Sequence, residues 1–391
     1  MRLPAALVLA VCLWPVPSLA QTAPVPQVDI PDVIRAVRKL PPASTNQSPS
    51  EAKITFLPTI SSNPAIGVAV GAVASLASRR SGPDGPLSSA QASFTLTTKK
   101  QIIGAVRNNV YSRNGNWSLV GDVRLAKFYQ RGPRLGSDAP VDDDTIDVDY
   151  KWIRLYQTAY RRVGGAFHVG VGYHLDSFID IELADGETAT RSGDLVGELN
   201  RTTVASGLSA SALLDSRDNP LNASRGIYAR ASYHLYPEGL GSDSEWQSTQ
   251  LEARAYLRLP SDRRQVLAAW AQSWHTLDGD PPYFNLPSVG WDTYGRSARG
   301  YTAGSLRGRG WGYVESEYRV DLMRNGFMGA VGFVNASTLS DRHGVYGDWA
   351  VGGGAGLRFK LDKKYGTNIA MDFAWGRDGS RGVWFGLNEV F

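Results

Sequence analysis

Hydrophobic and polar residues alternate along most of the chain after about residue 50. In the stretch around Leu251, Leu251 and Leu257 share one face with small apolar residues, whereas Glu252 and Arg254 share the other face. The same pattern recurs around Glu317, which alternates with apolar or aromatic neighbours. A period of two residues is typical of β-strands with one apolar and one polar face. The pattern therefore predicts an all-β chain.

Turn residues divide this part of the chain into sixteen segments. We expect strands at residues 53–61, 64–78, 87–99, 101–113, 117–130, 151–163, 166–182, 201–218, 226–237, 244–260, 265–279, 308–322, 328–340, 350–362, 367–378 and 382–391. A soluble sandwich of two sheets would alternate in the same way, so the length of the segments decides between the two. Most of them exceed the roughly nine to eleven residues that a tilted strand needs to cross a bilayer.

The lengths of the connections support a membrane-spanning antiparallel β-barrel of about sixteen strands. The long connections, at residues 131–150, 183–200 and 280–307, all follow odd-numbered strands, and those after even-numbered strands include several short ones. Outer-membrane barrels have short periplasmic turns and long outer loops. Both termini are therefore expected in the periplasm. The outer loop is rich in Asp from Asp142 to Asp149, which favours a solvated acidic loop over a metal site.

The first half-hundred residues have a different organisation. Residues 1–20 combine Arg2, a short apolar run and a small residue at Ala20, which is the pattern of a cleaved signal peptide. Residues 21–52 are rich in Pro, Ser, Thr and Gln and are expected to form a periplasmic linker. Within it, residues 31–40 are equally compatible with a short amphipathic helix and with a frayed turn. The barrel domain is then expected over residues 53–391.

The composition and charge of the chain exclude some classes of function. A net charge of +4 on 391 residues is too small to indicate a nucleic-acid partner. The only cysteine, Cys12, lies in the predicted signal peptide, which excludes disulfides and thiolate metal sites from the mature chain. We expect no metal and no cofactor. The 42 Gly, 17 Tyr and 11 Trp suit turns and the aromatic belts at membrane interfaces.

Two parts of the sequence carry chemistry that points to a known family. The connection between the eighth and ninth predicted strands contains Asp215, Arg217, Asp218, Asn219, Pro220 and Gly226. These residue types build a tight turn that caps itself. Their order resembles the Asp-x-Arg-Asn/Asp-x-Pro…Gly turn of BamA/TamA-type outer-membrane proteins, the bacterial surface antigen family. The chain also ends on Phe391, with Phe385 and Leu387 at alternating positions before it, which resembles the signal that engages the outer-membrane assembly machinery.

The longest predicted outer loop carries the second resemblance. It contains Arg299, Gly300, Tyr301, Gly304 and Arg307. In the BamA/TamA family the matching loop folds into the lumen, and the Arg of an Arg-Gly-Phe/Tyr tip contacts an acidic residue of the wall. The usual Asp of the thirteenth strand is replaced here by Asn335. The inward carboxylates left as candidate partners, in order of preference, are Glu317, Asp372 and Glu315.

The resemblance implies a stand-alone outer-membrane barrel that assists the insertion or transport of proteins or lipids. Its expected partners are outer-membrane lipid and, during biogenesis, the assembly machinery. The segment ahead of the barrel is too short for the periplasmic POTRA domains of the family. The alternative is a passive diffusion channel without an assembly role. A barrel enzyme using His174 and Asp176 is the third class, and we expect no enzymatic activity because no nucleophile accompanies this pair.

Overall fold

The computed structural model describes residues 26–41, 52–63, 67–79, 85–132, 135–137, 146–184, 196–293 and 295–391. The predicted signal peptide, residues 21–25 and 42–51 of the predicted linker, and the acidic residues Asp142, Asp143 and Asp144 lie outside these ranges. Within them, no helix is both long and apolar enough to cross a membrane.

The described chain contains one α-helix, α1 (Ile30–Val37), and sixteen strands. The strands are β1 (Lys53–Asn63), β2 (Gly67–Ser78), β3 (Ser88–Thr97), β4 (Ile102–Tyr111), β5 (Trp117–Gly132), β6 (Ile146–Gly164), β7 (Phe167–Leu183), β8 (Thr203–Asp215), β9 (Gly226–Tyr236), β10 (Trp246–Arg258), β11 (Gln265–Gly279), β12 (Gly310–Asp321), β13 (Met328–Leu339), β14 (Ala350–Asp362), β15 (Thr367–Trp375) and β16 (Arg381–Leu387). Short 3-10 helices lie at η1 (Val196–Glu198), η2 (Glu238–Leu240) and η3 (Tyr283–Asn285).

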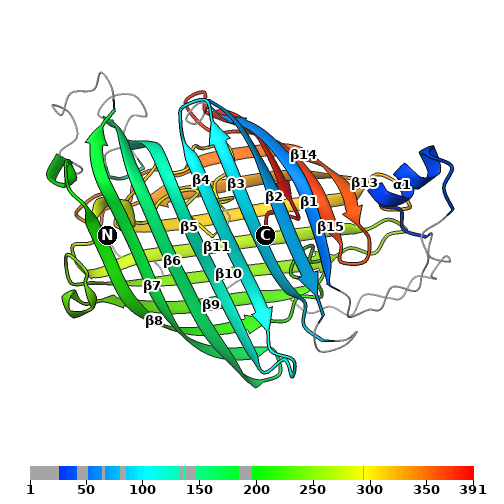
Figure 1. The fold of residues 1–391 in the computed structure, drawn as a ribbon, viewed down its shortest axis with the longest axis horizontal. Helices are drawn as coiled ribbons and strands as arrows, with labels where there is room; N and C mark the ends of the chain where they lie inside the picture. The colour runs from blue at the N-terminus through cyan, green and yellow to red at the C-terminus, as the bar shows by residue number, and fades with distance from the viewer. Residues whose placement is uncertain are drawn as a thin grey trace.

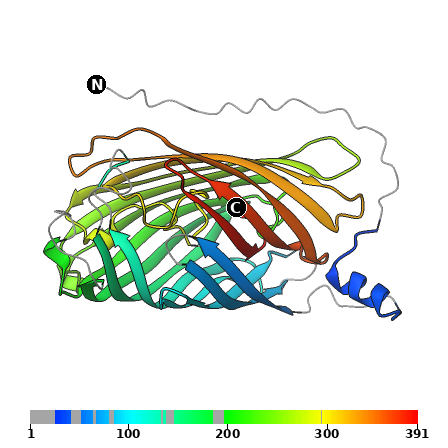
Figure 2. The same cartoon turned by 90° about the horizontal axis from the view of Figure 1, so that it is seen from above.

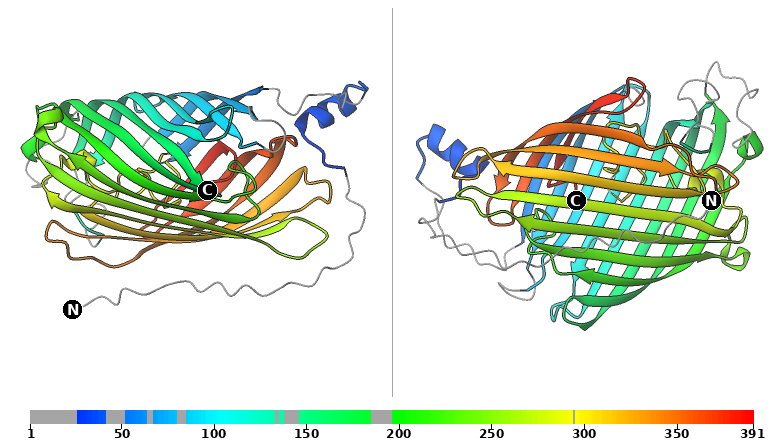
Figure 3. Two further views of the ribbon diagram at one scale, coloured as in Figure 1. Left: turned by 90° about the horizontal axis from the view of Figure 1, so that it is seen from below. Right: turned by 180° about the vertical axis from the view of Figure 1, so that it is seen from behind.

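The strands form a single antiparallel barrel in which each strand pairs with its neighbours in the sequence (Figure 1). Figures 2 and 3 show the strands enclosing a lumen, with the long connection between β11 and β12 inside it. This arrangement confirms the predicted fold class and the predicted number of strands. Hydrogen bonding between neighbours all around a barrel leaves no free sheet edge in the bilayer, which is why strands can cross it.

The two faces of the barrel wall differ as the alternation predicts. On β12, Val314 and Tyr318 are exposed on the outside, whereas Glu315 and Glu317 are buried in the lumen. On β10, Leu251 and Leu257 are exposed, and Glu252 is buried. An apolar outside and a polar inside is the distribution expected of a wall that faces lipid.

Most element boundaries differ from the sequence predictions by a few residues. Strand β6 begins at Ile146 rather than 151, so Asp147 and Asp149 belong to a strand and not to the acidic loop. Both β5 and β7 pair with this extension, and these hydrogen bonds outweigh the low strand propensity of Asp. Strand β16 ends at Leu387 rather than 391. Helix α1 ends three residues before the predicted limit.

The barrel closes through an unusually short contact between its first and last strands. Within the part of the chain that the structure describes, strands β1 and β16 share a single register pair, Ser62 with Val383. By contrast, β15 and β16 pair continuously from Ile369–Leu387 to Trp375–Arg381, and β1 and β2 pair along the whole of β1. We call the β1–β16 junction the seam. Among the described residues it is the junction with the fewest register pairs between neighbouring strands.

Candidate functional site

The connection between β11 and β12, residues 280–309, enters the lumen, and we call it the lumen loop. Its apolar residues Val289, Tyr301 and Leu306 pack in one buried cluster with Trp270 and Trp311 of the wall. A second cluster joins the start of the loop to aromatic residues of β6 and β7. The loop is therefore a packed part of the barrel interior.

Arg299 lies at the centre of the lumen loop's contact with the wall. Its side chain is buried, and its Nη1 donates to Asp372 Oδ2 at 2.7 Å. Its Nη2 contacts Glu315 and Glu317. The structure thus brings Arg299 together with all three candidate carboxylates, whereas a single partner was expected from the sequence.

Asn335 and Phe333 complete the surroundings of Arg299. The Nδ2 of Asn335 donates to the backbone oxygen of Arg299 at 2.9 Å. The guanidinium of Arg299 lies over the ring of Phe333, 3.5 Å from its centroid. Asn335 therefore binds the backbone of the loop, and the carboxylates of Glu315, Glu317 and Asp372 balance the charge of the Arg299 guanidinium. The polar function expected of an Asp in this strand is divided between several residues here.

Gly300 and Tyr301 fit the tip of the loop between β14 and the β15–β16 turn. Gly300 has φ +104°, and a Cβ at this position would lie 2.5 Å from the backbone oxygen of Trp375. The hydroxyl of Tyr301 donates to Val351 O at 2.6 Å and accepts from the backbone N–H of Arg377 at 3.1 Å. Only glycine allows both this backbone conformation and this approach.

Gly304 and Arg307 stabilise the loop from within. Gly304 has φ +82°, and its N–H donates to Val289 O at 2.9 Å. Arg307 is fully buried and donates to the backbone oxygens of Tyr283 and Leu286 at 3.1 and 3.2 Å. Burial lowers the pKa of the Arg307 guanidinium. Arg307 therefore connects the two ends of the loop rather than the loop and the wall.

Arg296 connects the lumen loop to the end of the chain, a role that the sequence reading missed. Its guanidinium donates to the backbone oxygens of Leu387 and Glu389 at 2.6 and 2.5 Å. The side chain of Asp292 accepts from the backbone N–H groups of Arg296 and Ser297 and so fixes this turn. The sequence feature that could have indicated this role is the position of Arg296, three residues before Arg299 in the same turn-rich stretch.

The last four residues, Asn388–Phe391, leave the wall and turn into the lumen, and we call them the C-terminal segment. Asn388 has φ +69°, which ends strand β16. Phe391 is buried, and its ring lies 5.1 Å from that of Trp270. The prediction that Phe385, Leu387 and Phe391 share one strand is therefore wrong for Phe391. The change of backbone direction at Asn388 allows Phe391 to join the aromatic cluster, where its apolar surface is removed from water.

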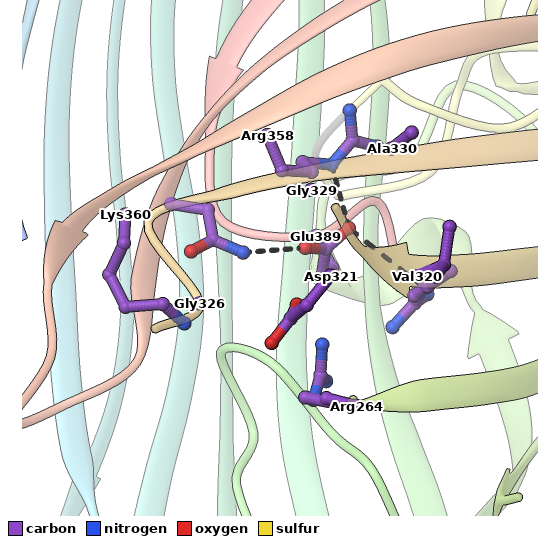
Figure 4. A pocket seen from close by; sticks show the side chains of 11 residues that line it. Arg264, Val320, Asp321, Gly326, Gly329, Ala330, Arg358, Lys360 and Glu389 are labelled. Atoms are coloured by element: carbon purple, nitrogen blue, oxygen red, sulfur yellow. Dashed lines mark hydrogen bonds and ion pairs between the residues drawn. The ribbon is translucent and has the colours of Figure 1, made fainter. Parts of the chain in front are cut away.

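Glu389 explains why the C-terminal segment is held inside (Figure 4). It accepts from Arg358 Nε and from Asn368 Nδ2, both at 2.8 Å, and lies near Arg319. Burial would raise the pKa of the Glu389 carboxyl, but the charges of Arg358 and Arg319 outweigh burial and hold the pKa well below its usual range. A glutamate at a position that is usually apolar in the terminal signal is thus a buried counter-charge.

The connection between β8 and β9 forms the compact turn that the sequence predicts. Asp215 and Arg217 form a bidentate ion pair with distances of 2.9 and 2.8 Å. Asp218 Oδ1 accepts from the backbone N–H groups of Asn219 and Ser224 at 3.0 and 2.8 Å. Gly226 has φ +103°, which ends the turn where β9 begins.

This turn also crosses the end of the barrel, which the sequence did not indicate. Asn219 and Asn222 donate to the backbone oxygens of Tyr365 and Gly366, in the β14–β15 turn, at 2.8 and 3.1 Å. Leu221 packs against Ala77, Leu87 and Tyr365. These partners belong to strands and turns that are not neighbours of β8 or β9 in the barrel. We call residues 216–225 the crossing turn.

The lumen loop and the crossing turn leave two internal cavities. One, of about 200 Å³, is lined by residues of both, including Pro220, Leu221 and Trp291, and by charged residues of the wall such as Arg154 and Glu252. The other, of about 230 Å³, lies beside the seam and is lined by Thr59, Arg296, Arg299, Asp372 and Trp384 among others. The lining residues of the two cavities do not overlap.

The pair proposed for the enzyme alternative is engaged in other contacts. Asp176 accepts from Arg154 and Trp152, and His174 Nε2 lies 2.9 Å from Ser209 Oγ. The ring of His174 lies next to that of His234. Among the described residues there is no group of three or more His, Cys, Asp or Glu residues that could hold a metal ion.

The fold and the lumen contacts define a membrane-spanning β-barrel whose interior is occupied by its own loop, turn and C-terminal segment. The Omp85 superfamily domain matches residues 111–389, and the chain belongs to this superfamily. A barrel of this superfamily is a bacterial outer-membrane protein. The BamA/TamA-type resemblance expected from the sequence is thereby confirmed.

Two solved structures have a similar fold. BamA from Haemophilus ducreyi lacking POTRA domains 1–3 is 14% identical, with a TM-score of 0.54, and the match covers 86% of this chain and 70% of that chain. CdiB from Acinetobacter baumannii is 13% identical, with a TM-score of 0.52, and the match covers 87% of this chain and 65% of that chain. The chain thus spans about two thirds of the length of each. No curated protein matches the sequence.

Proposed function

We propose that this barrel assists the insertion or transport of proteins or lipids at the outer membrane by opening at the seam. The observation that carries the proposal is the single register pair between β1 and β16. Each backbone hydrogen bond between strands must be broken before they separate, so a junction with one register pair opens at the lowest free energy. The proposal takes the short-turn end, and both termini, as periplasmic.

The filled lumen supports the seam as the route. The lumen loop, the crossing turn and the C-terminal segment occupy the lumen, and the two cavities beside them have volumes of about 200 and 230 Å³. An unfolded barrel protein or a lipid is too large for such spaces. The cavity lined by Trp384 and Thr59 lies on the lumen side of the seam, where strand separation would connect it to the bilayer.

A disulfide across the seam tests the proposal. Ser62→Cys with Val383→Cys joins the one register pair, and Ile60→Cys with Val70→Cys joins a fully paired junction between β1 and β2 as a control. Both pairs are placed in a Cys12→Ser background. Liposomes containing each variant are given a small unfolded outer-membrane barrel protein, and its folding rate is measured. We expect oxidation to abolish the acceleration only in the seam variant, with recovery on reduction. Equal acceleration in oxidised and reduced seam variants would contradict the proposal.

A passive diffusion channel is the second candidate, favoured by the charged walls of the two cavities. It requires a continuous aqueous path through the lumen. Large constitutive conductance of the parent protein in planar bilayers, together with no acceleration of client folding or lipid transfer, would support the channel and not the seam.

A further inference from the structure

We propose that α1, with the residues that follow it to Leu40, lies in the headgroup region of the membrane leaflet at the short-turn end of the barrel. In this position its apolar face enters the acyl chains and its basic residues contact anionic phospholipid. The partner is thus a lipid surface. The helix would act as a membrane contact of its own, outside the barrel wall (Figure 1).

The helix is firmly placed at this end of the barrel. The Val28 N–H donates to Asn325 O, in the β12–β13 turn, at 3.1 Å. The Lys363 N–H, in the β14–β15 turn, donates to Asp29 Oδ2 at 3.1 Å, and Lys363 Nζ donates to Asp32 Oδ2 at 2.5 Å. Asp29 and Asp32 also form a capping box that starts the helix. The position of the helix relative to the barrel is therefore set by two turns.

The apolar face of the helix has no protein partner in the described structure to cover it. The exposed fractions of Ile34, Val37 and Leu40 are 46%, 78% and 50%. At 100° per residue Ile34 and Val37 lie on one side of the helix. Leu40 follows in the turn after the helix, where Lys39 has φ +54°. Isolated helices of this length are marginal in water, and burial of an apolar face is the usual source of their stability.

The surroundings of the helix favour lipid as the cover. Leu322 and Met323, in or next to the turn that holds Val28, are themselves exposed on the outside of the barrel. The helix therefore starts at the level where the apolar band of the wall ends. Arg35 in the helix, and Arg38 and Lys39 directly after it, carry three positive charges, which complement anionic headgroups. An apolar face opposite a basic face is the composition of interfacial helices.

Fluorescent labelling at two positions tests this proposal. Cys12 is the only cysteine, so a Cys12→Ser background accepts a single NBD label at Val37→Cys or at Lys39→Cys. Each protein is reconstituted in phosphatidylcholine vesicles with or without phosphatidylglycerol. We expect the Val37 label to be quenched by nitroxide-bearing lipid, and the Lys39 label to be quenched several-fold more by aqueous iodide than the Val37 label.

Charge reversal gives the second measurement. In Val37→Cys protein, the additional changes Arg38→Glu and Lys39→Glu are expected to reduce quenching by nitroxide lipid and to remove its increase with phosphatidylglycerol. Two results would overturn the proposal: equal iodide access at both positions, which means a helix in water, or a shielded Val37 label that nitroxide lipid does not quench. The latter means a protein partner or a second copy. Heat-modified mobility of every variant in gels verifies that the barrel is folded.

Discussion

Among the residues of the lumen loop, Arg299 is the one that forms ion pairs with three buried carboxylates. Its guanidinium contacts Glu315, Glu317 and Asp372, and all four side chains are almost fully buried. A buried charge that loses its partner keeps the cost of leaving water without the attraction that offsets it. Arg299 is therefore one of the side chains that couple the lumen loop to the wall.

Arg299→Ala is expected to lower the free energy of unfolding by about 3–5 kcal/mol, the usual range for breaking a buried ion pair. Urea unfolding in detergent micelles, followed by tryptophan fluorescence, measures the change. The matched control is Arg309→Ala, which removes an arginine of the same loop whose partner Asp280 is almost completely exposed. That variant is expected to change stability by less than about 1 kcal/mol. Similar losses in the two variants would contradict the assignment.

Glu198 gives the lumen loop a dependence on pH. It accepts a hydrogen bond from the backbone N–H of Tyr283, at the start of the loop. Burial raises the pKa of the Glu198 carboxyl from 4.5 to about 7. A carboxyl whose pKa is raised by folding favours the folded state while it is protonated, so its contribution is fully present below pH 4.5 and is lost as the pH rises through 7.

The thermal midpoint of the parent protein is therefore expected to fall between pH 5 and pH 8.5, and Glu198→Gln is expected to reduce this fall. Glutamine still offers an oxygen to Tyr283 but carries no charge to bury. Heat-modified gel mobility across this pH range measures both proteins. A parallel pH dependence in the parent and in Glu198→Gln would show that another group is responsible.

The C-terminal segment has two roles that experiments can separate: a predicted targeting role in the unfolded chain and a structural role in the folded barrel. As a targeting signal, Phe391 would act while the chain is unfolded, whereas in the folded barrel it packs against Trp270. Glu389 serves the folded barrel because its partners Arg358 and Arg319 come from distant strands. Refolding in detergent therefore isolates the structural role from the targeting role.

Glu389→Ala is expected to reduce the stability of protein refolded in detergent by about 3 kcal/mol or more, because two buried arginines lose a partner. Urea unfolding measures the loss, and replacement of the exposed Glu245 by Ala serves as the control. Unchanged stability of Glu389→Ala would mean that the C-terminal segment does not hold its place in solution.

The crossing turn is an element that depends on one glycine. In Gly226 a Cβ would lie 2.7 Å from the carbonyl carbon of Ser216, in addition to the strain of φ +103°. Gly241 has a similar φ of +94° but no atom within 4 Å of its Cβ position. The two glycines therefore differ in steric contact and not in backbone conformation.

Gly226→Ala is expected to cost about 2–4 kcal/mol of folding free energy, and Gly241→Ala about 1 kcal/mol, the cost of the backbone conformation alone. Urea unfolding of both variants gives the difference. Equal losses would show that the turn relaxes away from Ser216 and that its close packing is not important for stability.

The whole barrel has two obstructions in series, the lumen loop at one end and the crossing turn at the other. Conductance through two resistances in series is limited by whichever is left in place. Replacement of residues 292–304 by a Gly-Ser linker of equal length is therefore expected to raise single-channel conductance only partly. Replacement of residues 219–223 as well is expected to raise it several-fold further. Full opening by the first replacement would show that the crossing turn does not obstruct the lumen.

Much of the architecture could be predicted because strand patterning is a local property. Lipid outside and water inside impose alternation on each strand separately, so Val314 and Glu315 reveal their faces without knowledge of any neighbour. Turn residues and connection lengths are local as well. Prediction failed where pairing with adjacent strands determines the conformation. Asp147 and Asp149 belong to a strand because β5 and β7 pair with this part of β6.

The candidate site was only partly predictable for the same reason. Arg299, Gly300 and Tyr301 were found through a local motif, and the structure gives Arg299 three partners from β12 and β15. The contacts that Arg296, Asn219 and Glu389 make across the lumen could not be predicted. Their partners are far away in the sequence, and such contacts leave no periodic pattern along the chain. Local order along the chain specified the strands, their faces and their number. Closure of the ring decided which loop, turn and terminus fill the interior and how few bonds hold the seam, since only closure brings opposite walls within reach of one side chain.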